Sequence, residues 1–466
     1  MMVFRRLSPP LKSNPGRAAA LSLALSAVCW SAQAQTSNAL QAADPATPAT
    51  TSAPLLLPPT GSAAALERPA DIARAREIWQ RANERVAEFP RGHIDLLRWE
   101  AANMPRPAGA TATPAAAPLD LAEALRTSLR QRPDLFTHAG MNALAMARVR
   151  VAYAAHVRDL QHAWIDAVAL QQRARHMASV LDASRTGSEL GARMVRAGNW
   201  SQARLMREQL GEATAWQAAA DAALAARGAT ERLARLLGLW RGADVDALAR
   251  RLPAALPALP LQPAPGEGLT EAGIEAAALR SHPLLAMAVA DTQRAVDALA
   301  PGRWAAWEAA TEAALQALPD PAGAQPAPPH IGSLTLLRDE KLEHAAEQQA
   351  ALLQRAAARR AMARQAWTDV RARHAGAQHA EQVVTELQNA LKQESLLRYN
   401  GMLESSWQLL GSARERIQAL DAALMARRGY WRAQASWQAV LAGADYTGGE
   451  AAMAGTAAAS NGAEGH

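Results

Sequence analysis

Two segments of this chain have the same pattern, and this internal repeat restricts the fold more than any other feature. The first segment, MVRAGNWSQARLMREQL, begins at Met194 and continues through an alanine-rich run to ARLLGLW, which ends at Trp240. The second, LLRYNGMLESSWQLLGSARERI, begins at Leu396 and continues to WQAVLAG, which ends at Gly443. Each has a glycine-containing turn between two long helical patterns. A unit used twice predicts two helical hairpins, with no obvious enzyme pocket.

The beginnings of the two halves also match each other. LDLAEALRTSLRQRPDL contains Asp120, which can cap a helix that ends before Pro133. LTEAGIEAAALRSHPLL has Thr270 and Pro283 in the corresponding places. We therefore predict a first helical repeat over residues 119–242, a linker over 243–268, and a second helical repeat over 269–443 with a proline-rich insertion at 301–335.

The composition indicates an all-α fold. Hydrophobic residues make up 50% of the chain but aromatic residues only 4%, and alanine, the best helix former, supplies much of the difference. Residues 141–181 contain neither proline nor glycine, which predicts a helix of about 60 Å at about 1.5 Å per residue. Gly187 and Gly191 are expected to loosen the chain after it. We predict an elongated bundle of long antiparallel helices with little or no β-strand.

The N-terminus has the features of a secretory signal over residues 1–34. Four basic residues precede an apolar run too short to span a bilayer, and SAQA offers a cleavage site after Ala34. The chain's one cysteine, Cys29, lies inside this leader in a poor lipoprotein context, and its lipidation stays open. A disordered Pro/Thr/Ala linker is expected over 35–68, a short helical segment and loop over 69–118, and a disordered tail over 444–466.

Charge and motifs argue against several classes of function. Four of the 49 basic residues lie in the leader, so 45 remain against 43 acidic residues, a formal charge of +2. With no basic block interleaved with aromatic residues, nucleic-acid binding is not expected. No catalytic or nucleotide-binding motif occurs, and His374 and His379 are poorly spaced for one helix face. We expect no enzymatic activity, no cofactor and no metal site.

The segments RAGNWS, LARLLGL, LLRYNGML and GYWRAQASWQAVLAG resemble the TolC-like outer-membrane efflux proteins, in the branch often found beside heavy-metal export genes. The resemblance covers about residues 119–443. It implies a homotrimeric α-helical tunnel through the periplasm, topped by a β-barrel in the outer membrane. Its expected partners are a periplasmic adaptor protein and an inner-membrane pump, in a tripartite system that exports small solutes or metal ions.

The resemblance also places the two glycine turns at helix tips that contact the adaptor. The residues assigned to these tips are Gly198, Asn199, Trp200, Ser201, Arg398, Tyr399, Asn400, Gly401, Met402 and Leu403. A simpler interpretation competes with this one, since any helical hairpin needs a turn of this kind. In that case Trp200 or Leu403 only packs against a neighbouring helix.

The chain departs from the family where membrane strands are expected. A membrane-spanning strand needs about 9–11 residues, and the segment between Pro133 and Tyr153 has no room for two of them. The insertion at 301–335 contains five prolines between Pro319 and Pro329, which disfavours strands. The barrel strands are therefore predicted to be reduced or missing. An alternative function therefore stays open: a structural or interaction role as a barrel-less coiled-coil protein of the periplasm. The expected location is the outer membrane or the periplasm.

Overall fold

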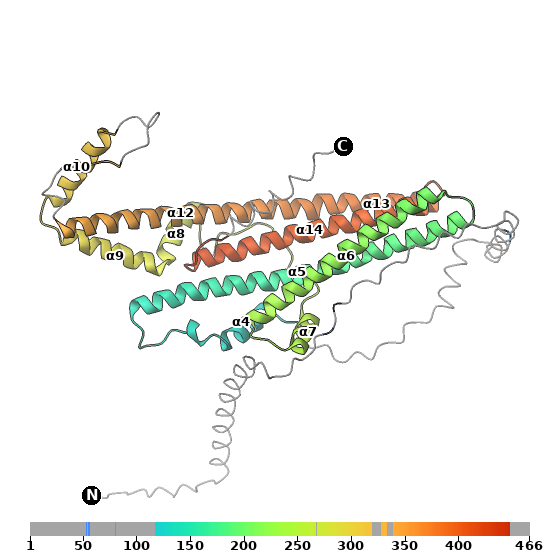
Figure 1. The fold of residues 1–466 in the computed structure, drawn as a ribbon, viewed down its shortest axis with the longest axis horizontal. Coiled ribbons are helices and arrows are strands. Elements are labelled where there is room, and N and C mark those ends of the chain that lie inside the picture. Colours follow the sequence, from blue (N-terminus) through green and yellow to red (C-terminus); the bar gives the residue numbers. More distant parts are fainter. Residues whose placement is uncertain are drawn as a thin grey trace, which may run out of the picture. The chain divides into compact units, whose positions relative to one another are not determined.

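The computed structural model describes residues 53, 55, 80, 117–266, 268–318, 328–332 and 339–447. Every regular element among them is a helix, as the all-α prediction required (Figure 1). None of the described helices is both long and apolar enough to cross a membrane. The predicted leader lies outside the described residues. Most of the predicted linker and most of the N-terminal helical segment also lie outside them, as does the predicted tail after Thr447.

The chain divides into two compact units. The described part of the smaller unit is Ala53 and Leu239–Ala247. In it, the backbone N–H of Ala53 donates to Asp246 Oδ2 at 2.6 Å, and the guanidinium of Arg241 lies over the ring of Trp240. All the long helices belong to the larger unit, which is formed by residues 54–238 and 248–466. That unit carries every feature described below.

The first half of the larger unit contains two long helices preceded by a short one. The elements are α4 (Leu121–Arg130), the 3₁₀ turn η1 (Pro133–Leu135), α5 (Ala143–Arg196) and α6 (Gln202–Leu236), and α7 (Gly242–Arg251) follows them across the boundary with the smaller unit. The carboxylate of Asp120 accepts the N–H of Glu123 at 2.5 Å, so the predicted cap of α4 is present. Ser201 caps α6 in the same way, through the N–H of Arg204.

The second half shows the same order of elements: a short helix, a proline, long helical segments, a turn and a final long helix. The elements are η2 (Glu271–Gly273), α8 (Ile274–Ser281), α9 (Pro283–Asp297), α10 (Arg303–Gln316), α12 (Glu340–His379), the π-helical turn η3 (Ala380–Val384), α13 (Thr385–Asn400) and α14 (Ser406–Leu441). Thr270 precedes η2 but its side chain makes no capping bond. Part of the predicted proline-rich insertion is therefore helix α10.

Helix α5 continues without interruption through Gly187 and Gly191, so the expected loosening there does not occur. Both glycines serve close packing instead. The carbonyl of Gly187 accepts the indole N–H of Trp407, from α14, at 3.3 Å. A Cβ on Gly191 would lie 3.2 Å from both Leu205 and Trp200. The helical cost of a glycine, about 1 kcal/mol relative to alanine, is here offset by the contacts that its missing side chain permits.

The long helices form a layer in which each hairpin has its own core. Between α5 and α6, the core contains Leu181 and Ala219, while Trp367 and Trp437 pack between α12 and α14 with ring centroids 5.7 Å apart. Contacts between α5 and α14 join the two hairpins. Helix α6 makes its extensive contacts with α5, and α13 makes its own with α14. The order across the layer is therefore α6, α5, α14, then α12 and α13.

Candidate functional site

The turn between α5 and α6 requires glycine. Gly198 has a φ of +75°, a conformation that L-residues rarely adopt. The N–H groups of Asn199 and Trp200 both bond to the carbonyl of Met194, at 2.9 and 3.3 Å, which closes the C-terminal end of α5. The predicted tip glycine of the first hairpin therefore has a definite backbone role.

The turn between α13 and α14 works differently from the sequence-based expectation. Gly401 has a φ of −80°, which any residue adopts, and a Cβ there would make only ordinary contacts. The left-handed residue is its neighbour Met402, with a φ of +61°, and the Leu403 N–H bonds to the Arg398 carbonyl at 2.8 Å. Met402 is 94% exposed, so this tip presents a large apolar side chain from a strained backbone position.

Relieving that strain should stabilise the protein. In Met402→Gly we expect the free energy of unfolding to rise by about 0.5–1 kcal/mol, because removing a left-handed L-residue releases roughly 1–2 kcal/mol while the added freedom of glycine in the unfolded chain offsets part of it. Denaturant midpoints followed by circular dichroism measure the change. In Gly198→Ala, the matched control, the free energy of unfolding should fall by about 1 kcal/mol, because alanine is strained in the left-handed conformation of that residue. A destabilised Met402→Gly protein would mean that the Met402 side chain itself holds the turn.

The two hairpin turns lie at the same end of the layer (Figure 1), and two tryptophans connect them. The ring of Trp200 lies 4.1 Å from that of Trp407 at the start of α14, and the guanidinium of Arg204 lies 3.9 Å above Trp200. Trp200 therefore packs against a neighbouring helix, as the simpler interpretation proposed. Leu403 does not, because it is exposed beside Met402.

The other predicted tip residues differ in accessibility. Asn199, Ser201, Arg398, Asn400 and Gly401 are exposed, and Tyr399 is half-buried. Arg398 bonds to Glu394 at 3.1 Å and lies 3.5 Å from Glu404. Trp407 is not among the tip residues assigned from sequence, although a tryptophan at this place in a helical segment is expected to anchor helix packing. What brings it to Trp200 is the contact between the two hairpins.

Both margins of the helix layer expose rows of large apolar side chains. On α6 these are Met206, Leu210 and Leu224, and on η3 and α13 they are Val383, Val384, Leu387, Leu391 and Leu397. Most members of a row are three, four or fourteen residues apart, which places them along one side of a helix. Leu397 follows Leu391 by six residues, and the exposed Leu396 lies off the row. A single exposed leucine has no special meaning. A row of them on each outer helix is an exposed apolar surface of the kind found at interaction sites.

A polar cluster with unusual titration lies in the interior, between α5 and α14. The Asp166 carboxylate bonds to Arg428 at 2.8 Å and Arg432 at 2.5 Å. Burial alone would raise the pKa of Asp166, but the bonds and charges of the two arginines outweigh it and lower that pKa. His162 Nε2 donates to the Arg432 carbonyl at 3.0 Å. Burial, with the nearby charge of Arg432, lowers the pKa of His162 to about 4, so this side chain is neutral at pH 7.

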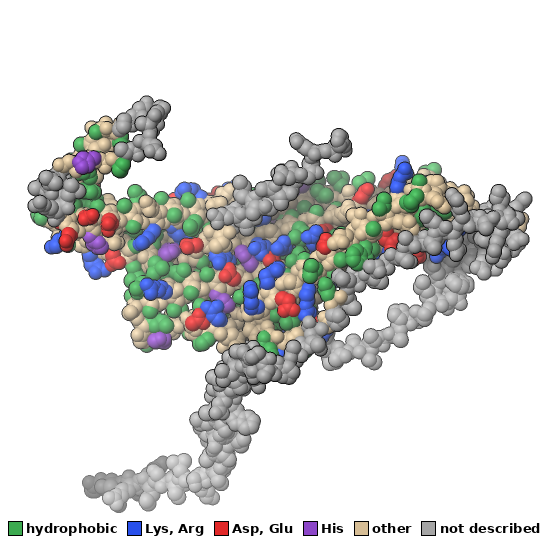
Figure 2. Space-filling view, in the orientation of Figure 1, with side chains coloured by type: hydrophobic (Ala, Val, Ile, Leu, Met, Phe, Trp, Pro, Cys, Tyr) green, Lys and Arg blue, Asp and Glu red, His purple; other side chains and the backbone are tan. Residues whose placement is uncertain are grey.

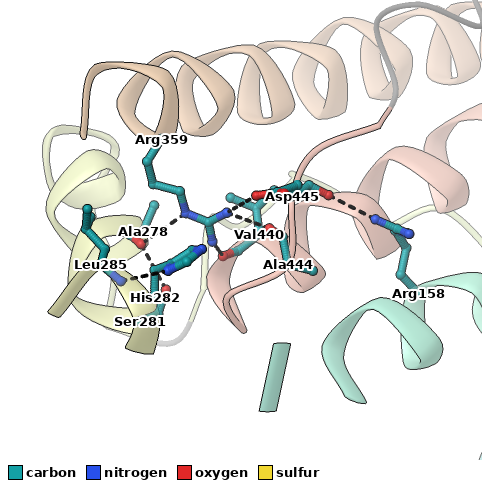
Figure 3. A network of polar contacts seen from close by, with 9 residues as sticks. All are labelled: Arg158, Ala278, Ser281, His282, Leu285, Arg359, Val440, Ala444 and Asp445. Atoms are coloured by element: carbon teal, nitrogen blue, oxygen red, sulfur yellow. Dashed lines mark hydrogen bonds and ion pairs between the residues drawn. The ribbon is translucent and has the colours of Figure 1, made fainter. Parts of the chain in front are cut away.

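A second interior cluster is centred on Arg359, which is only 3% exposed (Figure 3). Its guanidinium donates to three backbone carbonyls, those of Ala278 (3.3 Å), Ala444 (2.6 Å) and Val440. The carboxylate of Asp445 lies 3.6 Å away. Arg359 thus binds carbonyls in the last turns of α8 and α14 and the carbonyl of Ala444, just beyond α14. The Ala278 carbonyl also accepts the Ser281 hydroxyl, and the Val440 carbonyl also accepts the Gly443 N–H. Residues 444–447, assigned to the tail from sequence, are held against the helices here: Ala444 is buried, and Asp445 accepts a bond from Arg158 at 2.9 Å through its carbonyl.

Both clusters are built mainly from ion pairs and from bonds to backbone carbonyls. In the first cluster the hydroxyl of Ser436 lies 3.1 Å from His162 Nε2, but that nitrogen also donates to the Arg432 carbonyl, so it is not a free base. Among the described residues, no group of three or more His, Cys, Asp and Glu side chains could hold a metal ion. Basic and acidic side chains are interspersed on the face seen in Figure 2, without a large area of one sign. The hairpin tips and the exposed margins of the layer are therefore the candidate functional surfaces.

No family model matches the chain, and no curated protein matches it significantly. Solved structures similar to it include the outer-membrane channel OprN, at 20% identity over 69% of this chain and 72% of that one, with a TM-score of 0.45. Others are the outer membrane protein VceC from Vibrio cholerae (13% identity, 70% and 76% covered, TM-score 0.45) and CusC (14%, 80% and 92%, TM-score 0.41). Because these TM-scores are below 0.5, the proposal below rests on the chain's own geometry and motifs.

Proposed function

We propose that this protein is a TolC-like component of an export system, in which three copies form a helical tunnel across the periplasm for small solutes or metal ions. The observation that carries the proposal is the helix layer with two uncovered margins. A layer that exposes leucines along both outer helices is incomplete as a single chain. Pairing the α6 margin of one copy with the α13 margin of the next covers both rows.

This pairing joins two different surfaces, so it is head-to-tail, and repetition about an axis closes it into a ring. The positions of the exposed leucines support the register. Leu210 is nine residues after Ser201, which caps α6, and Leu391 is nine residues before Asn400, which ends α13. Since both turns lie at one end of the layer, these leucines come to about the same height in neighbouring copies. The number of three subunits follows from the family resemblance.

The same arrangement gathers the hairpin tips of all copies at one end of the ring. Met402 and Leu403 would then project as repeated apolar contacts toward a periplasmic adaptor, beside the polar residues Asn199 and Asn400. The adaptor would connect the tunnel to an inner-membrane pump. The proposal includes secretion across the inner membrane and a final location in the outer membrane or the periplasm. It assigns no chemical step to the protein.

Thiol cross-linking tests the ring directly. In a Cys29→Ala background, Leu210→Cys combined with Leu391→Cys should give covalent dimers and trimers with a short bismaleimide, and nothing larger, because a closed ring of three has no free margin. The products are counted on denaturing gels after treatment of the full chain in membranes and after purification. A product series that continues beyond three, or monomer alone, would contradict the proposed tunnel.

Two controls separate this interface from chance collisions. Either cysteine alone should give no product, since a head-to-tail interface does not place a residue next to its own copy. Leu210→Cys combined with Leu261→Cys should also give none. Leu261 is 91% exposed but belongs to the segment after α7 rather than to the margin of the layer, so it matches Leu391 in chemistry and accessibility only.

A further inference from the structure

A cavity of about 580 Å³ opens between α5, α9 and α12, in the larger unit. This volume is within the usual range of small-molecule sites, roughly 300–1,000 Å³. Its lining has an apolar part and a positively charged part. Leu144, Leu285, Met287 and Met362 provide apolar surface, while Arg148, Arg355 and Arg359 provide three guanidinium groups. None of the lining residues lies on α6, η3 or α13, whose margins the proposed ring joins.

Two of these arginines have no partner in the described structure. Arg148, on α5, and Arg355, on α12, make no ion pair and no side-chain hydrogen bond with any described residue. Arg359, in contrast, is held by the three carbonyls described above. Arg148 and Arg355 are exposed to water, and only Arg359 is buried. The positive charge gathered at the cavity favours an anion over a neutral or cationic ligand. A guanidinium binds a carboxylate or phosphate through two parallel hydrogen bonds, which makes such a group the best-matched anion.

The remaining polar groups in the lining do not neutralise the two free arginines. Asp291 is paired with Arg294 on its own helix, and Asp445 lies beside Arg359. His282 lies next to Arg359 (Figure 3) and accepts the N–H of Leu285 through Nδ1 at 3.1 Å. Burial, together with the charge of Arg359, lowers the pKa of His282. It is therefore neutral at pH 7, and its Nε2 carries a hydrogen that can be donated.

We infer that the cavity binds an amphipathic anion, a carboxylate on an alkyl chain, with the head group between Arg148 and Arg355 and the chain against Met287, Leu285 and Met362. A small inorganic anion would leave the apolar wall exposed to water. An uncharged chain would leave the guanidinium groups uncompensated. The inference goes beyond the proposed export role, because it concerns a resident or regulatory ligand held in the wall of the molecule.

Isothermal titration of the full-length protein with dodecanoate, below its micelle concentration, tests the inference. We expect one site per chain. Dodecyl maltoside, which has the same chain and a neutral head group, and acetate, which has the head group alone, should each bind at least about tenfold more weakly. A hydrogen bond to a charged group is worth roughly 1.5–3 kcal/mol, so losing it weakens binding about tenfold or more.

Three variants locate the site. Arg148→Gln with Arg355→Gln should weaken dodecanoate binding at least about tenfold, and Met287→Gln should weaken it without changing acetate binding. Arg360→Gln, the matched control, removes an arginine of the same helix that faces Glu275 rather than the cavity and should change nothing. Equal affinity for acetate or for the maltoside would overturn the inference. So would undetectable binding, or unchanged affinity in the double arginine variant when circular dichroism shows the wild-type fold.

Discussion

Arg359→Met should lower the free energy of unfolding by about 3 kcal/mol. The substitution keeps the apolar stem of the side chain but removes the guanidinium donor from the carbonyls of Ala278, Val440 and Ala444. The Ala444 carbonyl is then left without a partner, whereas Ala278 keeps the Ser281 hydroxyl and Val440 keeps the Gly443 N–H. A buried unpaired carbonyl costs roughly 1–3 kcal/mol and each lost bond to a charged donor roughly 1.5–3 kcal/mol, but the total is reduced because a buried guanidinium is itself expensive to desolvate. Denaturant unfolding followed by circular dichroism measures the loss. Asp445 is 69% exposed at its side chain, so its unpaired carboxylate adds little.

The matched control is Arg360→Met, on the next residue of the same helix. Arg360 bonds to Glu275 at 2.8 Å on the surface, and exposed ion pairs contribute about 0–1 kcal/mol. We therefore expect Arg359→Met to lower the free energy of unfolding at least two to three times as much as Arg360→Met. Equal losses at the two positions would show that Arg359 does not connect α8, α12 and the end of α14 as described.

Acidification from pH 7 to pH 4 should destabilise the protein by up to about 3 kcal/mol through His162. In the unfolded chain this histidine has a pKa near 6.5, whereas burial lowers it to about 4 in the folded protein. Between those values the unfolded state binds more protons, so stability falls as the pH falls. A difference of about 2.5 in pKa corresponds to about 3 kcal/mol. Unfolding curves at half-unit intervals of pH measure the slope.

His162→Gln is the control for this pH dependence. Glutamine keeps a donor for the Arg432 carbonyl but does not titrate, so the slope between pH 6.5 and pH 4 should lose the contribution of His162. His156 and His282, whose pKa values burial also lowers, still contribute to the slope. The contribution of Asp166 remains separate. Its pKa is lowered in the folded protein, so its stabilisation is complete above the unfolded value of about 4 and declines below it. An unchanged slope in His162→Gln would mean that His162 titrates normally in the folded protein.

The sequence alone was sufficient for features that depend on neighbouring residues. The cap at Asp120 is a bond to an N–H three residues away, and the helix before Pro133 ends within a few residues of that signal. Alanine content and the scarcity of proline in the long runs predicted the all-α fold. The turn at Gly198 was recognisable because only glycine adopts its backbone conformation without strain.

Where the sequence-based expectations failed, the competing interaction came from a distant part of the chain. Gly187 and Gly191 resemble helix breakers when read locally, yet Trp407 and Leu205 make them sites of close packing. At the second tip, the presence of Gly401 suggested the left-handed position, but the turn places Met402 there. The sequence left open whether Trp200 and Leu403 pack against a neighbouring helix, and the structure packs the half-buried Trp200 against Trp407 of α14 while Leu403 is exposed.

The amino-acid sequence by itself determined the all-α fold and the cap of α4, because these depend on propensity and on hydrogen bonds within one or two turns. Only the tertiary structure decided which surfaces remain uncovered, which arginine is buried and which arginines line a cavity without partners. Arg359 and Arg355 are four residues apart on α12, and nothing local distinguishes them. Their different roles arise because α8 and the end of α14 bring backbone carbonyls to one of them, while the other faces the cavity beside α9.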